Sequence, residues 1–241
     1  MAGKSNFAEW DIQLVSQRTM KPIDDDSGVY NVLQANDPSE ITLYSDGNGT
    51  SASNPGTMTD GRFTFWADSA TTSVDISVLT STGHAFFLED VSQSDHHIEV
   101  NTEKMENTLI IPFQVVGASE AVVDTGFDIL DNMLMKDCWI HITTLGTGAV
   151  LNIGSSTTNG GFASGVSVAA TGWPVTLIDE ALVSGSSLIG TFLALGTGTN
   201  VRKLHKRANA TSGANIIYIN TTSSSTAGEG YIYLTYLRLP A

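Results

Sequence analysis

The stretch from Leu43 to Trp66, LYSDGNGTSASNPGTMTDGRFTFW, is the part of the sequence that most resembles a ligand site. Asp46, Asn48 and Thr50 have the alternate spacing of the first three ligands of an EF-hand calcium loop. Such a loop would bind Ca²⁺ through carboxylate, amide and hydroxyl oxygens.

The calcium pattern fails at its two most demanding positions. The sixth residue is Ser51, where the loop needs glycine, and the twelfth is Thr57, where it needs a glutamate. Asp46-Gly47, Asn54-Pro55-Gly56 and Asp60-Gly61 are instead typical of tight turns between strands. We therefore expect these residues to form the turns between strands and to bind no metal.

Histidine provides a second candidate metal site. His96 and His97 lie in the segment Asp95-His96-His97-Ile98-Glu99, but adjacent side chains of a strand point to opposite faces. Two interpretations are open: a solvated strand end, or a metal site completed by symmetry in an oligomer.

No catalytic pattern is present in the sequence. There is no Gly-x-Ser-x-Gly and no glycine-rich phosphate loop with its lysine. Paired acids occur at Asp24–Asp26 and at Asp179-Glu180, but sequence alone does not place them across a cleft. The single cysteine, Cys138, lies in an apolar run and is expected to be a buried thiol instead of a nucleophile. We expect no enzyme activity, no catalytic residue and no cofactor.

Basic residues cluster near the C-terminus. Arg202, Lys203, Lys206 and Arg207 supply 4 of the 11 lysines and arginines within six residues. They fit a charged hairpin edge that blocks pairing with other strands, or a surface that binds an acidic partner.

The charge is unevenly distributed along the chain. Residues 1–138 carry 22 of the 25 acids and 6 of the 11 lysines and arginines, a balance of −16, whereas residues 139–241 have a balance of +2. The acidic front half argues against nucleic acid as a partner, because phosphates would be repelled. The nearly neutral back half is typical of a surface buried in an assembly.

Alternation of apolar and polar residues predicts an all-β fold. The run from Val74 to Val78 places apolar residues on one face and polar residues on the other, and turn signals recur every 8 to 12 residues. We predict two antiparallel β-sandwich domains, a small one at 31–103 and a larger, jelly-roll-like one at 104–241. A short helix or a further strand is expected at 176–183.

Residues 1–30 show no sustained period, and we interpret them as an extended arm or a frayed terminus. Phe7 and Trp10 favour an arm that docks on a partner, since a solvated tail has little use for an exposed tryptophan. The sequence contains neither a signal-peptide pattern nor a stretch of about 18 apolar residues. We expect a chain made in a cytoplasm, with no membrane partner.

Three segments resemble a β-module of structural proteins in tailed bacteriophage virions: VVDTGFDILDNMLMKDCWIHITT, LNIGSSTTNGGFASGVSVAATG and GYIYLTYLRL. The first half, through Asn54-Pro55 and the run from Asp60 to Trp66, is similar to sandwich modules of phage head and tail appendages. The resemblance covers about 70% of the chain and contains no catalytic residue.

The resemblance implies a non-enzymatic virion protein of the decoration or head-fibre type. We expect it to form a homotrimer, to lie on the capsid exterior and to contact the major capsid protein or another virion protein. The alternative is a tail fibre or adaptor that binds a host-surface glycan or another tail component, with Trp66 or Trp173 stacked on sugars or buried in the core. A third alternative, a polysaccharide hydrolase, would need acids clustered in a groove, and the sequence shows no pattern that indicates such a cleft.

Overall fold

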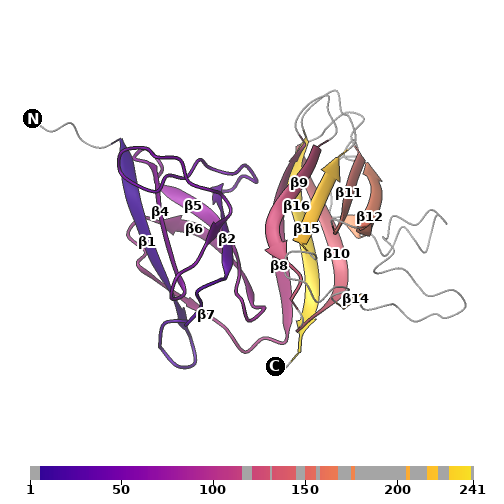
Figure 1. Cartoon of the computed structure of the whole chain (residues 1–241), viewed down its shortest axis with the longest axis horizontal. Coiled ribbons are helices and arrows are strands. Elements are labelled where there is room, and N and C mark those ends of the chain that lie inside the picture. Colours follow the sequence, from indigo (N-terminus) through magenta and orange to yellow (C-terminus); the bar gives the residue numbers. More distant parts are fainter. Residues whose placement is uncertain are drawn as a thin grey trace, which may run out of the picture. The chain divides into compact units, whose positions relative to one another are not determined.

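Strands make up all the regular structure that the computed structural model describes (Figure 1). The described residues are 6–115, 121–130, 132–144, 150–155, 158–167, 175–176, 205–206, 216–221 and 228–239. The predicted all-β class is confirmed. Of the element expected at 176–183, only Thr176 is among the described residues. Trp173 and residues 202, 203 and 207 lie outside them. Among the residues described there is no helix with the length and hydrophobicity needed to cross a membrane.

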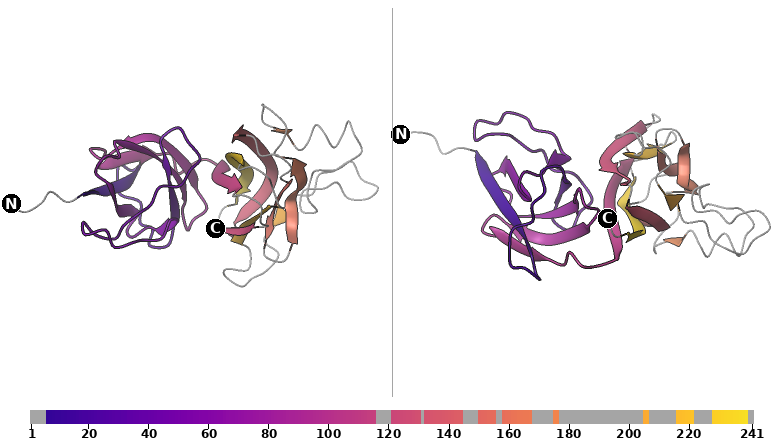
Figure 2. Two further views of the ribbon diagram at one scale, coloured as in Figure 1. Left: turned by 90° about the horizontal axis from the view of Figure 1, so that it is seen from above. Right: turned by 60° about the horizontal axis from the view of Figure 1, so that its bottom comes forward.

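The chain divides into two compact units, Met1–Lys104 and Met105–Ala241. Unit 1 contains β1 (Phe7–Ser16), β2 (Val29–Gln34), β3 (Gly56–Thr57), β4 (Arg62–Asp68), β5 (Ser73–Leu79), β6 (Ala85–Ser92) and β7 (His97–Val100). Its sheets have the orders β4-β1-β7 and β3-β2-β5-β6, and the β1–β7 pair is parallel. Seen from above, these strands surround the interior of the unit (Figure 2).

Alternation explains how unit 1 forms its core. In β4, Phe63, Phe65 and Ala67 are buried, and the residues between them face outward. The largest members of the core are Trp10, Tyr30, Phe63, Phe65, Met58 and Ile76. Trp10 stacks on Phe65 with ring centroids 5.7 Å apart.

The N-terminal segment differs from the expected arm. Although β1 is extended, it is the central strand of its sheet, and Trp10, Ile12 and Leu14 are fully buried in the core. Its period was obscured because Gln13 and Ser16 are also buried, so the end of the strand is covered on both faces. The Gln13 amide is satisfied by the backbone oxygens of the turn at 60–61.

Unit 2 contains β8 (Glu106–Val115), β9 (Ala121–Asp128), β10 (Met133–Thr144), β11 (Val150–Ser155), β12 (Thr158–Ser167), β13 (Val175–Thr176), β14 (His205–Lys206), β15 (Ile216–Thr221) and β16 (Gly228–Arg238). One sheet has the order β13-β10-β16-β8, with β14 also on β10, and the other has the order β12-β11-β15-β9. The closing strand β16 therefore lies between β8 and β10 (Figure 1).

This connectivity is that of a jelly roll. Because β16 occupies one edge of β10, both β13 and β14 pair along its other edge and act as one strand position. Counted in chain order, the eight positions form sheets 1-8-3-6 and 2-7-4-5, which is a double-sheet Greek-key arrangement. Buried residues between the sheets include Leu109, Phe127, Met135, Cys138, Phe162, Ile217 and Tyr236.

Candidate functional site

The stretch from Leu43 to Trp66 forms turns around the short strand β3 and before β4, as predicted. Asp60 and Gly61 both have positive φ, at 52° and 67°, and the backbone groups of Thr59 and Arg62 pair on either side of them. A side chain at Gly61 would meet the backbone oxygen of Ile23 at 2.0 Å, so the close approach also requires glycine.

Asp46 closes its own turn through hydrogen bonds to both carboxylate oxygens. Its Oδ1 accepts hydrogen bonds from the backbone N–H groups of Asn48 at 2.9 Å and Thr50 at 3.1 Å. Its Oδ2 accepts the Thr50 hydroxyl at 2.8 Å. The hydroxyl and backbone hydrogen bonds from Thr50, with those from Asn48 and Gly49, lower the pKa of Asp46.

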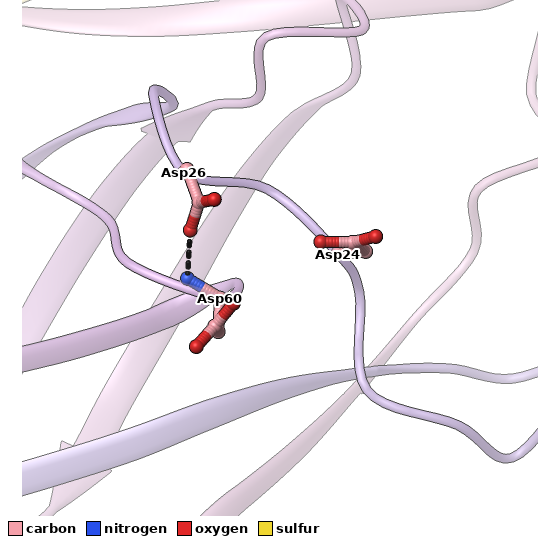
Figure 3. A group of neighbouring side chains, drawn as sticks. All are labelled: Asp24, Asp26 and Asp60. Atoms are coloured by element: carbon pink, nitrogen blue, oxygen red, sulfur yellow. Dashed lines mark hydrogen bonds between the residues drawn. The ribbon is translucent and has the colours of Figure 1, made fainter.

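A different acidic group forms where the turn at Asp60 meets the segment Asp24–Asp26 (Figure 3). Asp24, Asp26 and Asp60 are exposed, and one carboxylate oxygen of each lies within 4.8 Å of the others. The backbone N–H of Asp60 donates to Asp26 Oδ1 at 2.7 Å. Oxygen ligands of this kind suit Ca²⁺, but clustered acids on a surface are no more than a candidate site.

Asp25, the buried residue between Asp24 and Asp26, holds the backbone of this acidic group in place. Asp25 accepts the backbone N–H groups of Ser27, Gly28 and Ser81 at 3.1, 2.9 and 2.8 Å, and its own backbone oxygen accepts Gly61 N–H at 2.7 Å. The acids at Asp24–Asp26 are evident in the sequence, but their proximity to Asp60 is not, because a contact across 34 residues leaves no local pattern.

The predicted partner-binding residues have separate positions. Phe7 is half-buried and packs on Tyr44, with ring centroids 4.3 Å apart. Trp10 has no exposed surface, so its side chain serves the core and not a docking contact. Of the basic cluster, only the backbone of Lys206 is described, in β14. Its role as a binding surface stays a prediction.

His96 and His97 are exposed at the start of β7. Neither belongs to a group of three potential metal ligands among the residues that were described. Cys138 is fully buried in β10, and burial raises the pKa of its thiol, which disfavours a nucleophilic thiolate.

A more extensive candidate is the second face of the β10–β16–β8 sheet. In β16 every second residue is buried in the core, while Tyr231, Tyr233, Thr235 and Leu237 between them are half-buried. Trp139 on β10 and Ile110 on β8 lie directly opposite Tyr233 on either side.

A second row on the same face pairs His141 with Tyr231, and a third pairs Leu134 with Leu237. We call the residues Ile110, Leu134, Trp139, His141, Tyr231, Tyr233 and Leu237 the Tyr233 face. The cross-strand partners could not be predicted, because they depend on the jelly-roll register.

Comparison with known proteins identifies no family. Neither the protein-family models nor the curated proteins include a match to this sequence. A solved structure described as "Crystal Structure of the STIV MCP", a viral major capsid protein, is 10% identical in sequence. The similarity covers 96% of this chain and 86% of that chain with a TM-score of 0.25, which is too low to carry an argument about fold or function.

Proposed function

We propose that this chain is a non-enzymatic structural protein of a bacteriophage virion. It decorates or projects from the capsid exterior as a symmetric oligomer, for which we favour a homotrimer. The observation that carries the proposal is the Tyr233 face, which presents a tryptophan, two tyrosines and aliphatic side chains on one face of the β10–β16–β8 sheet. Aromatic enrichment with few charges is typical of the core of a protein interface.

The jelly-roll connectivity of unit 2 supports the proposal by analogy. Jelly rolls build many viral capsid proteins, but also lectins and cupins, so the fold alone does not decide the function. The virion assignment rests in addition on the resemblance of unit 2 to phage modules. The expected partners are further copies of this chain and the major capsid protein or another virion protein.

The use of polar side chains in unit 1 supports a structural role. Within the described part of the chain, the buried carboxylates of Asp25 and Asp75 accept hydrogen bonds from backbone N–H groups, and Asp46 accepts donors from its own turn. A catalytic carboxylate would need an oxygen directed toward a substrate. These carboxylates instead stabilise loops.

Charge supports an exterior position and contact with a partner of opposite sign. Unit 1 holds 16 acids and 5 lysines and arginines, a balance of −11. The basic cluster at 202–207 offers the complementary charge, either to unit 1 of a neighbouring copy or to another acidic virion surface.

Light scattering on the purified chain tests the oligomer and the role of the Tyr233 face together. For the natural chain we expect a mass of about three times 25.5 kDa, that of a homotrimer. Tyr233→Lys places a charge in the centre of the face and should shift the mass to that of the monomer. Tyr218→Lys is the matched control: Tyr218 is half-buried on β15 in the other sheet, and a lysine there can pair with Asp124.

The two variants separate the possible failures. A natural chain that stays at 25.5 kDa at all concentrations contradicts the oligomer. If a folded Tyr233→Lys variant is still an oligomer, the Tyr233 face is not the interface, although the proposed oligomer itself is not contradicted.

A further inference from the structure

Unit 1 contains a pocket of about 410 Å³ at one end of its two sheets. It lies between the end of β2, represented by Gln34, and the turn from β4 to β5, represented by Asp68 and the residues 71–73. This volume lies within the range of roughly 300–1,000 Å³ that is usual for small-molecule sites.

The lining of the pocket is polar but contains no cation. It offers the Gln34 amide, the Asp68 carboxylate and the hydroxyls of Thr71, Thr72 and Ser73, with Ile41 as an apolar contact. An anionic ligand would find no opposite charge there, and the balance of −11 in unit 1 would repel it. A lipid or hydrocarbon would leave these donors and acceptors without partners.

Most polar side-chain atoms of the pocket make no hydrogen bond to other described residues. Asp68 Oδ1 accepts the backbone N–H of Ala70 at 2.8 Å, which fixes the turn, but Oδ2 makes no hydrogen bond within the described part of the chain. The same holds for the side chains of Gln34, Thr71, Thr72 and Ser73 within that part of the chain. By contrast, Asp25, Asp46 and Asn54 are occupied by bonds to loops.

We propose that this pocket binds one ring of a neutral sugar. Sugar hydroxyls both donate and accept hydrogen bonds, which matches an amide, three hydroxyls and one carboxylate oxygen. The C–H surface of the ring would pack on Ile41. This inference does not depend on the proposed place in the virion, and it also suits the alternative of a glycan-binding tail fibre or adaptor.

Trp66 extends the site beyond a single ring. It lies two residues before Asp68 on β4, and alternation places both side chains on the outward face of that strand. The Trp66 indole is half-buried, with Tyr44 directly opposite it on the neighbouring segment. A second sugar ring leaving the pocket along this face would stack on the indole.

Nuclear magnetic resonance of the isotope-labelled full chain tests the proposal. Glucose, galactose, mannose and N-acetylglucosamine are each titrated to millimolar concentrations, because single-ring ligands bind weakly. We expect at least one of them to shift the backbone amide signals of Gln34, Asp68 and residues 71–73. No shift with any of the four sugars, or shifts centred elsewhere, would overturn the proposal.

Variants test whether the pocket itself binds the sugar. The double variant Thr71→Val and Thr72→Val should weaken binding about tenfold or more, since it removes two hydrogen-bonding groups. Asp68→Asn keeps an acceptor for Ala70 N–H while it removes the charge, and it should also weaken binding. Thr19→Val makes the same chemical change at an exposed turn and should leave binding unchanged. Folded pocket variants that bind as well as the natural chain would refute the site.

Two further arms identify the source and class of the ligand. A disaccharide of the bound sugar should bind more tightly than the single ring, and Trp66→Ala should remove that gain without affecting the single ring. This result indicates the end of a surface polysaccharide, whereas equal binding of one and two rings indicates a free monosaccharide. Tighter binding of methylammonium than of any neutral sugar would contradict the proposal and assign the pocket to amines.

Discussion

The side-chain amide of Asn54 hydrogen-bonds to both backbone groups of Val32. Nδ2 donates to the Val32 oxygen at 2.7 Å, and Oδ1 accepts the Val32 N–H at 3.0 Å. Nδ2 also donates to the Ile41 oxygen at 3.1 Å. Because β3 pairs with β2 only at Val29 and Tyr30, Asn54 continues that edge with a side chain in place of a strand.

Asn54→Asp should therefore destabilise unit 1. A carboxylate cannot donate to the oxygens of Val32 and Ile41, so the Ile41 oxygen loses this donor and the Val32 oxygen keeps only the backbone N–H of Ile41. We expect a loss of about 1–3 kcal/mol in the free energy of unfolding, measured by urea denaturation. Asn48→Asp makes the same change at an exposed position of the same stretch and should have a much smaller effect. Equal effects of the two substitutions would show that the Asn54 bonds do not stabilise unit 1.

Trp10 should behave as a core residue. Trp10→Ala is expected to cost about 3–5 kcal/mol of unfolding free energy, because it removes a fully buried ring that stacks on Phe65. Trp10→Phe should cost much less, since an aromatic ring remains and Nε1 has no hydrogen-bond partner among the residues described. If Trp10→Ala unfolds at the same urea concentration as the natural chain, the core assignment is wrong.

The pKa of Asp46 should depend on Thr50. In the folded chain it lies below the ordinary value of 3.8, chiefly because of the Thr50 hydroxyl and N–H donors. The ionised carboxylate therefore favours folding above the ordinary pKa, and this contribution is lost as the pH falls through the lowered value. Thr50→Val should move the pKa upward in a carboxylate titration followed by nuclear magnetic resonance.

Asp95 provides an internal control for that titration. Its pKa is also lowered, chiefly by hydrogen bonds from the Ser92 backbone and hydroxyl, which Thr50→Val does not touch. We expect the Asp95 pKa to stay the same. An unchanged Asp46 pKa in the variant would show that the Thr50 hydroxyl does not bind the carboxylate in solution.

Cys138 should be unreactive in the native chain. Its side chain is fully buried in β10, and burial raises the thiol pKa, so the nucleophilic thiolate is scarce at pH 8. We expect no reaction with a thiol-specific disulfide reagent until urea unfolds unit 2, after which one equivalent reacts. Rapid reaction of the native chain would show that the Cys138 thiol is accessible and nucleophilic, contrary to this prediction.

Local patterns predicted the all-β class and several individual turns. The alternation in β4 and the Asp60-Gly61 dipeptide report on adjacent residues, and the structure confirms both. The prediction for β1 was less successful because Gln13 is a polar residue in a buried position, made possible by bonds to backbone oxygens of the turn at 60–61. Only the tertiary structure supplies those acceptors.

Sites built across the sequence could not be predicted. The backbone N–H of Asp60 donates a hydrogen bond to the Asp26 carboxylate, 34 residues away in the sequence. Gln34 and Asp68 line the same pocket only because two sheets end at the same place. The rows of the Tyr233 face likewise require the pairing of β16 with both β8 and β10. Such placements follow from connectivity, which short-range patterns do not encode.

An image of the intact particle tests the central claim most directly. If the proposed virion role is correct, electron cryomicroscopy of phage particles that contain this chain should show symmetric copies on the capsid exterior, with the Tyr233 faces of neighbouring copies buried against each other. Absence of the chain from purified particles would contradict the virion assignment. Copies confined to the tail would replace the capsid proposal with the fibre or adaptor alternative.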